Sequence, residues 1–170
     1  MRTHSFINTL MRTSMSLKTS NLTKVSLLLA TLMAAPLTYA VDDERAAAAY
    51  ESRHGLFAMV RLYFGPMYGM MRGAPYDADV VKHNAAQISA LAKMIPDAFV
   101  VDTRENDLDT EALDDIWEDM NDFTSKAATL AERAATLSEE GSTGEDAFKA
   151  AFGGMGQACK ACHDNYREQE

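Results

Sequence analysis

The sequence predicts an all-α protein, folded as an up-down-up-down bundle of four helices. Turn-forming residues are scarce, with only 4 Pro and 9 Gly in 170 residues, whereas an all-β protein needs a turn about every 8–12 residues. Hydrophobic residues make up 47% and charged residues 24% of the chain, the balance of a globular protein. Four stretches after residue 40 repeat apolar residues at spacings of three and four, the pattern of helices that bury one face.

Residues 1–40 are expected to form a cleaved secretory signal peptide ahead of a single domain at 41–170. The segment contains no acidic residue, and its apolar run at 25–35 is shorter than the ~20 residues that span a bilayer. Small residues at positions 38 and 40 then suit a cleavage site. A basic, Ser/Thr-rich segment also fits a mitochondrial transit peptide, but the continuous apolar block favours export. We therefore expect a periplasmic protein with no membrane span in its mature chain.

The predicted domain is strongly acidic. All 25 acidic residues lie after position 40, together with 12 of the 16 basic residues. Such a domain repels nucleic acid, because the phosphates of nucleic acid require Lys and Arg partners. The charge instead suits a basic partner protein or a small uncharged ligand.

The first two helices are predicted at 43–71 and 78–95. Pro66 lies inside the first and is expected to kink or interrupt it, since Pro has no N–H to donate. Asp77 is a candidate N-cap for the second helix, and Pro96 is expected to stop it. The apolar stripes of the two helices consist of Tyr50, Phe57, Val60, Phe64 and Met67, and of Val81, Ile88, Leu91 and Ile95.

An acidic connection at 96–109 leads to the third predicted helix, at 110–138. The apolar residues of this helix alternate at three and four without a fault, a heptad seam that is typical of helices packed nearly parallel. The fourth helix is predicted at 143–167. Ser142 and Glu145 fit a capping box at its start, in which two side chains satisfy the first free backbone N–H groups.

Both cysteines lie in one motif, Cys159-Lys160-Ala161-Cys162-His163. The Cys-x-x-Cys-His pattern is typical of c-type haem attachment. Residues three apart on a helix share a face, so both thiols can form thioethers to one haem edge while His163 binds the iron. A thioredoxin-like disulfide would require strands around the motif, and two Cys with one His are one ligand short of a closed zinc site. We therefore expect one covalent haem c.

The combination of signal peptide, four helices and C-terminal motif resembles cytochrome c′, the class II cytochrome c family, which is itself a standard example of such a bundle. The likeness covers residues 41–170. It implies a bundle with haem c attached near the C-terminus, and homodimers formed through the first two helices. The local matches are Arg53-x-x-x-Phe57, Phe64-Gly65-Pro66-Met67, Ala74-Pro75-Tyr76-Asp77, Ile116-Trp117 and the motif with its continuation to Arg167.

The resemblance also implies which residues surround the haem. Phe57 takes the distal position, where low-spin relatives of the cytochrome c556 type have an iron-binding Met. A phenyl group has no lone pair, so the resemblance implies five-coordinate, high-spin iron that binds NO and CO and discriminates against O₂. Arg53 is expected near a haem propionate, and Arg167 beside His163 on the proximal side. The expected cofactor-binding residues are Cys159, Cys162, His163, Arg53, Phe57 and Arg167, with His163 as the metal ligand.

Two other functions remain open on the sequence. A c556-like electron carrier would hold two fixed axial ligands, and His54 is a candidate that lies three residues before the distal Phe57. A haem peroxidase would need a distal acid–base pair, typically His with Arg, and Phe57 in that place argues against one. We expect a gas-binding haem protein that is not an enzyme and that can exchange electrons with an unknown redox partner.

Overall fold

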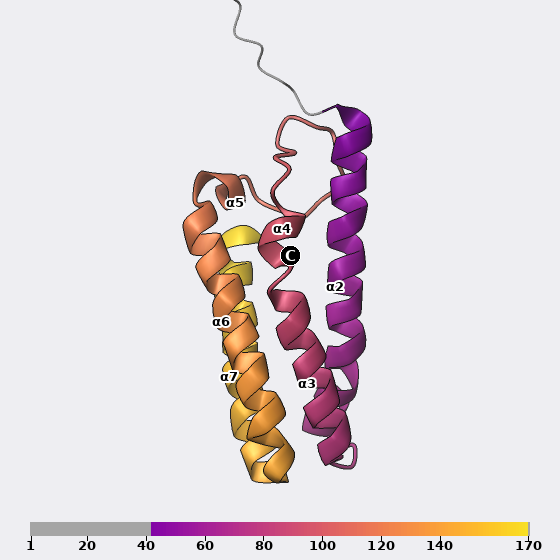
Figure 1. Ribbon diagram of the computed structural model, residues 1–170, viewed down its shortest axis with the longest axis vertical. Helices are drawn as coiled ribbons and strands as arrows, with labels where there is room; N and C mark the ends of the chain where they lie inside the picture. Colours follow the sequence, from indigo (N-terminus) through magenta and orange to yellow (C-terminus); the bar gives the residue numbers. More distant parts are fainter. Residues whose placement is uncertain (1–41, 170) are drawn as a thin grey trace, which may run out of the picture. The chain divides into compact units, whose positions relative to one another are not determined.

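The computed structural model describes residues 42–169, and the regular structure of these residues is helical (Figure 1). The predicted signal peptide lies outside the described part of the chain. Within residues 42–169 the only β pairing is an isolated bridge between Ala112 and Arg167, so the all-α prediction is confirmed. The four long helices are α2 (Asp43–Met71), α3 (Ala78–Ala92), α6 (Met120–Glu139) and α7 (Glu145–Tyr166). The short elements are α4 (Ile95–Ala98), α5 (Asp115–Glu118) and the 3₁₀ turn η2 (Gly141–Thr143).

The long helices alternate in direction and form the predicted up-down-up-down bundle (Figure 1). Their backbones pack closely between α2 and α3, between α3 and α6, and between α6 and α7, but not between α2 and α7. Of the helices described, none combines the length and the apolar composition required to cross a membrane. The candidate site residues lie on α2 and at the C-terminal end of α7.

Helix α2 runs without a break through Pro66, so the predicted interruption is wrong. The helix begins at Asp42, whose side chain accepts a hydrogen bond of 2.8 Å from the backbone N–H of Arg45. Pro66 removes a hydrogen bond to the carbonyl four residues earlier. That carbonyl belongs to Leu62, a residue that is 60% exposed, so water can satisfy it. After α2 the chain turns at Gly73, whose positive φ of 103° suits a residue without a Cβ.

Helix α3 begins as predicted and ends earlier than predicted. The Asp77 carboxylate accepts from the backbone N–H groups of Asp79 and Val80 at 3.0 and 3.1 Å, which confirms it as the N-cap. The helix ends at Ala92 instead of residue 95. Pro96 lies in the first turn of the separate short helix α4, where a residue without an N–H is tolerated because that N–H has no partner inside the helix.

The third predicted helix is wrong over residues 110–114 and is interrupted at Asp119. The chain forms the single turn α5, breaks at Asp119 (φ −131°, ψ 67°) and starts α6 at Met120. The Asp119 side chain accepts from the N–H of Asp122 at 3.0 Å and so caps the new helix. Short acidic side chains compete for backbone N–H groups in this way. Ile116 is nevertheless only 2% exposed. The heptad pattern therefore predicted the burial of this residue correctly, although the helix is interrupted after it.

The predicted capping box at the start of the fourth helix is also wrong. Gly144 occupies the N-cap position of α7 and provides no side-chain cap. Ser142 and Thr143 lie in η2, and their hydroxyls donate backwards to the carbonyls of Glu139 and Glu140 at 3.2 and 2.6 Å. Hydroxyls that bond the preceding turn are not available to cap the following one.

Three polar side chains fix α3 between its neighbours. Ser89 donates to the carbonyl of Ala131 at 2.8 Å, and Ser138 donates to the carbonyl of Lys82 at 2.7 Å, which joins α3 to α6. Asn84 donates to the carbonyl of Tyr63 on α2 at 3.0 Å. The bundle is therefore tied together along α3, while α2 and α7 meet through the stacked rings of Phe64 and Phe152, 5.3 Å apart.

Candidate functional site

The two cysteines lie on the last turns of α7, three residues apart and on one face of the helix. Cys159 and Cys162 are free thiols, half-buried, and packed against the hydrophobic core. Burial raises the pKa of both thiols, that of Cys162 to about 11. Their packing holds both sulfur atoms in place on this face of the helix.

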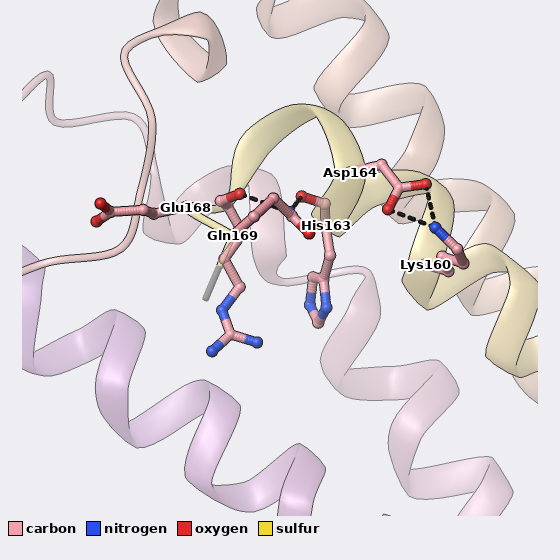
Figure 2. Close-up of a pocket in the computed structure, with 6 residues that line it drawn as sticks. Lys160, His163, Asp164, Glu168 and Gln169 are labelled. Carbon is pink, nitrogen blue, oxygen red and sulfur yellow. Dashed lines mark hydrogen bonds and ion pairs between the residues drawn. The ribbon is translucent and has the colours of Figure 1, made fainter.

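His163 borders an open pocket of about 500 Å³ at the end of α7 (Figure 2). Its imidazole points away from Lys160 and Asp164, which form an ion pair of 2.6 Å with each other. Partial burial lowers the pKa of His163, and the nearby Arg167 cation lowers it further. A neutral imidazole is the form that binds a metal. The pocket is lined by Lys160, His163, Asp164, Arg167, Glu168 and Gln169.

The segment just before α5 is held against the end of α7 by hydrogen bonds. The backbone N–H of Leu113 donates to the carbonyl of Tyr166 at 3.1 Å, and that of Glu168 donates to the carbonyl of Glu111 at 2.8 Å. The Glu111 carboxylate also accepts from Nε of Arg167 at 2.6 Å, and this pairing holds the pKa of Glu111 below its usual value. The sequence analysis missed Glu111, because it lies 56 residues from its partner and within no recognisable motif.

Tyr166 fixes the same end of α7 to α6. Its side chain is buried, and its hydroxyl donates to the carboxylate of Asp122 at 2.7 Å. Burial and this bond raise the pKa of Tyr166, and the phenol lowers the pKa of Asp122. The residues that follow the Cys-x-x-Cys-His motif are therefore held in defined positions by neighbouring elements.

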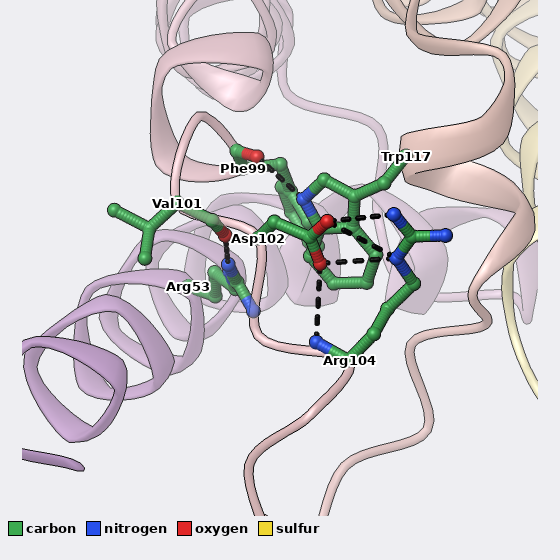
Figure 3. A network of polar contacts seen from close by, with 6 residues as sticks. All are labelled: Arg53, Phe99, Val101, Asp102, Arg104 and Trp117. Atoms are coloured by element: carbon green, nitrogen blue, oxygen red, sulfur yellow. Dashed lines mark hydrogen bonds and ion pairs between the residues drawn. The ribbon is translucent and has the colours of Figure 1, made fainter. Parts of the chain in front are cut away.

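Arg53 lies in the first half of α2 and is 3% exposed (Figure 3). Its guanidinium donates to the carbonyls of Ala98 and Val101 at 3.0 and 2.6 Å, and to Oγ1 of Thr103 at 2.9 Å. All three acceptors belong to the connection that follows α3. The structure thus uses this cation to hold that connection against α2. Its predicted contact with a haem propionate stays a prediction.

The charge of Arg53 is shielded by aromatic rings and by a nearby acid. The guanidinium carbon lies 4.5 Å from the ring centre of Phe99 and 5.1 Å from that of Trp117. Burial lowers the pKa of Arg53, while the charge of Asp102 raises it. The Asp102 carboxylate itself pairs with Arg104 at 2.7 Å (Figure 3).

A series of contacting aromatic rings connects Phe57, the residue expected on the distal side, to the end of α7. Phe57, one turn after Arg53, is half-buried, and its ring meets that of Phe99 edge-on at 6.4 Å. Phe99 contacts Phe123 at 5.0 Å, and Phe123 contacts Tyr166 at 5.2 Å. The structure therefore links Phe57 to the helix that carries the cysteines, although the two lie on the first and last helices. The sequence analysis missed Phe99 and Phe123, because their apolar character fits a plain core.

His54 is exposed and stacks on Tyr50 of the same helix, with ring centres 4.2 Å apart. The Trp117 indole donates to the carbonyl of Phe99 at 2.9 Å. Trp117 therefore fixes the connection that Arg53 also holds, and it belongs to the packing around the site.

The residues present fit a covalently bound haem. The two thiols share one face of α7, the imidazole borders an open pocket, and the backbones of α2 and α7 remain apart on that side. Over residues 42–169, no group of three or more His, Cys, Asp or Glu side chains is placed to hold a metal ion. Two thiols three residues apart, followed at once by an imidazole, suit the covalent attachment of a haem c.

Comparison with known proteins gives one consistent result. The family model described as cytochrome C′ matches residues 48–167. Cytochrome c′ of Cereibacter sphaeroides is 38% identical over 143 residues, which cover 82% of this chain and 95% of the relative. Cytochrome c-556 of Agrobacterium tumefaciens is 33% identical over 118 residues, covering 69% and 94%.

Solved structures agree. Cytochrome c prime from Shewanella frigidimarina superposes with a TM-score of 0.66 at 34% identity, covering 75% of this chain and all of that one. A nitric oxide complex of a variant of cytochrome c prime from Alcaligenes xylosoxidans superposes with a TM-score of 0.63 at 32% identity, covering 73% of this chain and 97% of that one.

Proposed function

Since this chain belongs to the cytochrome c′ family, whose members bind haem c covalently, it is a haem protein, and we propose that its iron keeps an open sixth position. In this proposal Cys159 and Cys162 carry the two thioethers, and His163 is the iron ligand. Their support is the motif spacing, the shared face of the two half-buried thiols and the imidazole at the pocket. The haem supplies an iron that binds small gases and exchanges single electrons.

The single observation that carries the open position is the identity of residue 57. Phe57 has no lone pair, and its ring is held half-buried against Phe99. In this proposal the Phe57 side chain occupies the distal side, where it cannot bind iron. We infer five-coordinate, high-spin iron in both oxidation states.

Ligand selection follows from the polarity of the distal side. Bound O₂ requires a hydrogen-bond donor to be stable, whereas NO and CO depend on one much less. The nearest aromatic neighbour of Phe57 is another hydrocarbon ring, Phe99. We infer that the ferrous protein binds NO and CO and discriminates against O₂. The nitric oxide complex of the Alcaligenes xylosoxidans variant supports the part of this inference that concerns NO.

Optical spectra of the haem-loaded protein test the proposal. The ferrous protein is expected to show a broad high-spin spectrum and to change on addition of NO and of CO. Phe57→Met places a thioether at the distal position and is expected to produce the sharp α and β bands of six-coordinate, low-spin haem. Leu62→Met adds a thioether on the exposed side of the same helix and is expected to leave the spectrum unchanged. A wild-type protein with sharp α and β bands, or a stable oxy complex, would contradict the proposal.

A low-spin electron carrier is the second candidate, since a relative is named cytochrome c-556. This candidate needs a second axial ligand in place of Phe57. His54 stacks on Tyr50 and is exposed, so it would have to leave that ring to reach the distal side. The same observation argues against a peroxidase, which needs a distal base fixed over the iron. We therefore place gas binding and accessory electron transfer before catalysis.

The location and partners of the protein belong to the same proposal. The signal peptide expected at 1–40 supports a periplasmic location, and the acidic domain supports a basic redox partner. Met59, Leu62 and Tyr68 expose apolar surface on α2, which supports homodimers formed through the first two helices. Sedimentation of the haem-loaded protein tests the dimer, and a monomer at micromolar concentration would contradict it.

A further inference from the structure

The ring of Phe99 packs against Phe57, the residue that the proposed function places on the distal side. We propose that Phe99 is a positioning residue for gas binding: it holds the Phe57 ring in place and thereby slows the entry of gas ligands. The inference rests on the proposed function, because Phe57 obstructs a gas only if it lies on the distal side of the iron. It concerns the rate of ligand entry and assigns no further iron ligand.

Phe99 is held by contacts of both its main chain and its side chain (Figure 3). The side chain is 4% exposed. Phe99 is the C-cap residue of α4, and its backbone N–H donates to the carbonyl of Pro96 at 3.1 Å. Its carbonyl accepts from the Trp117 indole at 2.9 Å. Its ring contacts those of Trp117 and Phe123, with centres 6.1 and 5.0 Å away. A residue held in this way does not readily follow a neighbour that moves.

Helix α2 presents two side chains to the Phe99 ring. Arg53 and Phe57 lie four residues apart, so they share one face of the helix. The guanidinium carbon of Arg53 lies 4.5 Å from the centre of the Phe99 ring. The Phe57 ring meets the same ring edge-on, with centres 6.4 Å apart and planes inclined at 65°. Arg53 also donates to the carbonyl of Ala98, the neighbour of Phe99, at 3.0 Å. The first half of α2 is therefore aligned with the end of α4 through this one ring.

The contact between the two phenyl rings opposes ligand entry. Aromatic rings attract one another edge-on at centre distances of about 4.5–7 Å. Phe57 is half-buried whereas Phe99 is buried, so Phe57 is the ring that moves when the contact breaks. A gas that enters on the distal side has to displace the Phe57 ring. The loss of the contact with Phe99 is then part of the barrier to entry.

The rate of CO association with the ferrous, haem-loaded full chain measures this barrier. Phe99→Leu removes the ring and keeps an apolar side chain. It is expected to raise the association rate about fivefold, the kinetic equivalent of one aromatic pair. Phe148→Leu is the matched control, because Phe148 is a buried ring near the start of α7, at the opposite end of that helix from the cysteines. The control is expected to lose stability and to leave the association rate unchanged.

A second background separates positioning from a direct effect of Phe99 on the gas. Phe57→Ala removes the ring that Phe99 holds, and by itself it is expected to accelerate CO association. In this background Phe99→Leu is expected to leave the association rate nearly unchanged, since no ring remains to be held.

Urea denaturation of the haem-loaded protein tests the contact in the absence of any gas. Phe57→Leu and Phe99→Leu are expected to be coupled, so that the double variant loses less stability than the sum of the two single variants. Phe148 contacts the rings of Tyr76 and Phe152 instead. The losses from Phe57→Leu and Phe148→Leu are therefore expected to add.

Three results would overturn the inference: an unchanged association rate in Phe99→Leu, an equal acceleration in both backgrounds, or strictly additive losses of stability for Phe57→Leu and Phe99→Leu. An acceleration in Phe148→Leu as large as that in Phe99→Leu would do the same, because it would show that any loosening of the bundle admits the gas. If Phe57→Ala accelerates association and Phe99→Leu does not, the inference fails and the proposed function stands. An unchanged rate in Phe57→Ala would contradict the distal position of Phe57, and with it both the proposed function and the inference.

Discussion

Two arginines were expected to serve the haem, and the structure places them in opposite environments. Arg53 is buried, with three hydrogen bonds to uncharged acceptors and two aromatic rings against its guanidinium. Arg167 is 41% exposed and pairs with the carboxylate of Glu111 at 2.6 Å. The comparison shows that the same residue type has two different roles in this protein. The buried cation organises the chain, and the exposed cation adds a charge to the pocket that His163 borders.

The physical reason lies in what surrounds each cation. A buried guanidinium has lost its water and needs every available acceptor, so removing it leaves those acceptors unpaired as well. An exposed guanidinium keeps its water, so its removal costs little structure but changes the local charge. Substitutions at Arg53 should therefore act on folding, and substitutions at Arg167 should act on the iron.

The largest effect is expected from Arg53→Met, which keeps the length of the side chain and removes its donors. The acceptors on Ala98, Val101 and Thr103 lose their partner, and we expect a loss of about 3 kcal/mol in the free energy of unfolding. Urea denaturation of the haem-loaded protein measures this loss. Arg61→Gln, an exposed arginine on the same helix, is the control and should change stability by less than about 0.5 kcal/mol. Equal stability of the Met variant and the wild type would refute the organising role.

Trp117→Phe is expected to have a smaller effect at the same place. The substitution removes the indole donor to the carbonyl of Phe99 while keeping an aromatic ring against Arg53. We expect a loss of about 1 kcal/mol, the usual worth of one such bond. Combining Trp117→Phe with Arg53→Met should cost less than the sum of the two, since both hold one connection. Strict additivity in urea denaturation would show that the two residues act independently.

Acid pH should weaken the same region through Asp102. The bond from Arg104 lowers the pKa of Asp102, so its stabilising contribution is present above the pKa of the unfolded chain, about 3.9. It is lost as the pH falls below that value and through the lower folded pKa. Asp102→Asn should therefore make stability less dependent on pH below about pH 4, as measured by urea midpoints at a series of pH values. An unchanged dependence would show that Asp102 is not among the groups that titrate on acid unfolding.

The smallest effect on folding is expected at the exposed pair. Arg167→Gln should change the free energy of unfolding by less than about 1 kcal/mol, while changing the midpoint potential of the iron. Thermal unfolding and redox titration on one preparation separate the two quantities. A large loss of stability in Arg167→Gln would mean that Arg167, like Arg53, is required for folding.

Short-range patterns predicted much of this fold. The spacing of apolar residues located all four long helices, and the Asp77 cap was identified from its residue type and position. The cysteine motif placed the candidate site on α7. Each of these features depends on residues within a turn or two of one another, which is the range over which helix physics acts.

The failures have equally physical causes. The break at Asp119 and the unused capping box both depend on which of several nearby groups a polar side chain hydrogen-bonds. The spacing of residues in the sequence does not show which of these hydrogen bonds forms. The partners of Arg53 lie 45 to 50 residues away, and Glu111 lies 56 residues from Arg167. Contacts of that kind are set by how the connection folds over the bundle, which no local pattern records.

The chain order of the helices has a consequence for biosynthesis. The cysteine pair lies on α7, which follows α2, α3 and α6 along the polypeptide. During translation, the segment that carries Phe57 and the segment that carries Glu111 are therefore made before the thiols exist. The prosthetic group can consequently be attached only after the residues of the other three long helices have been synthesised.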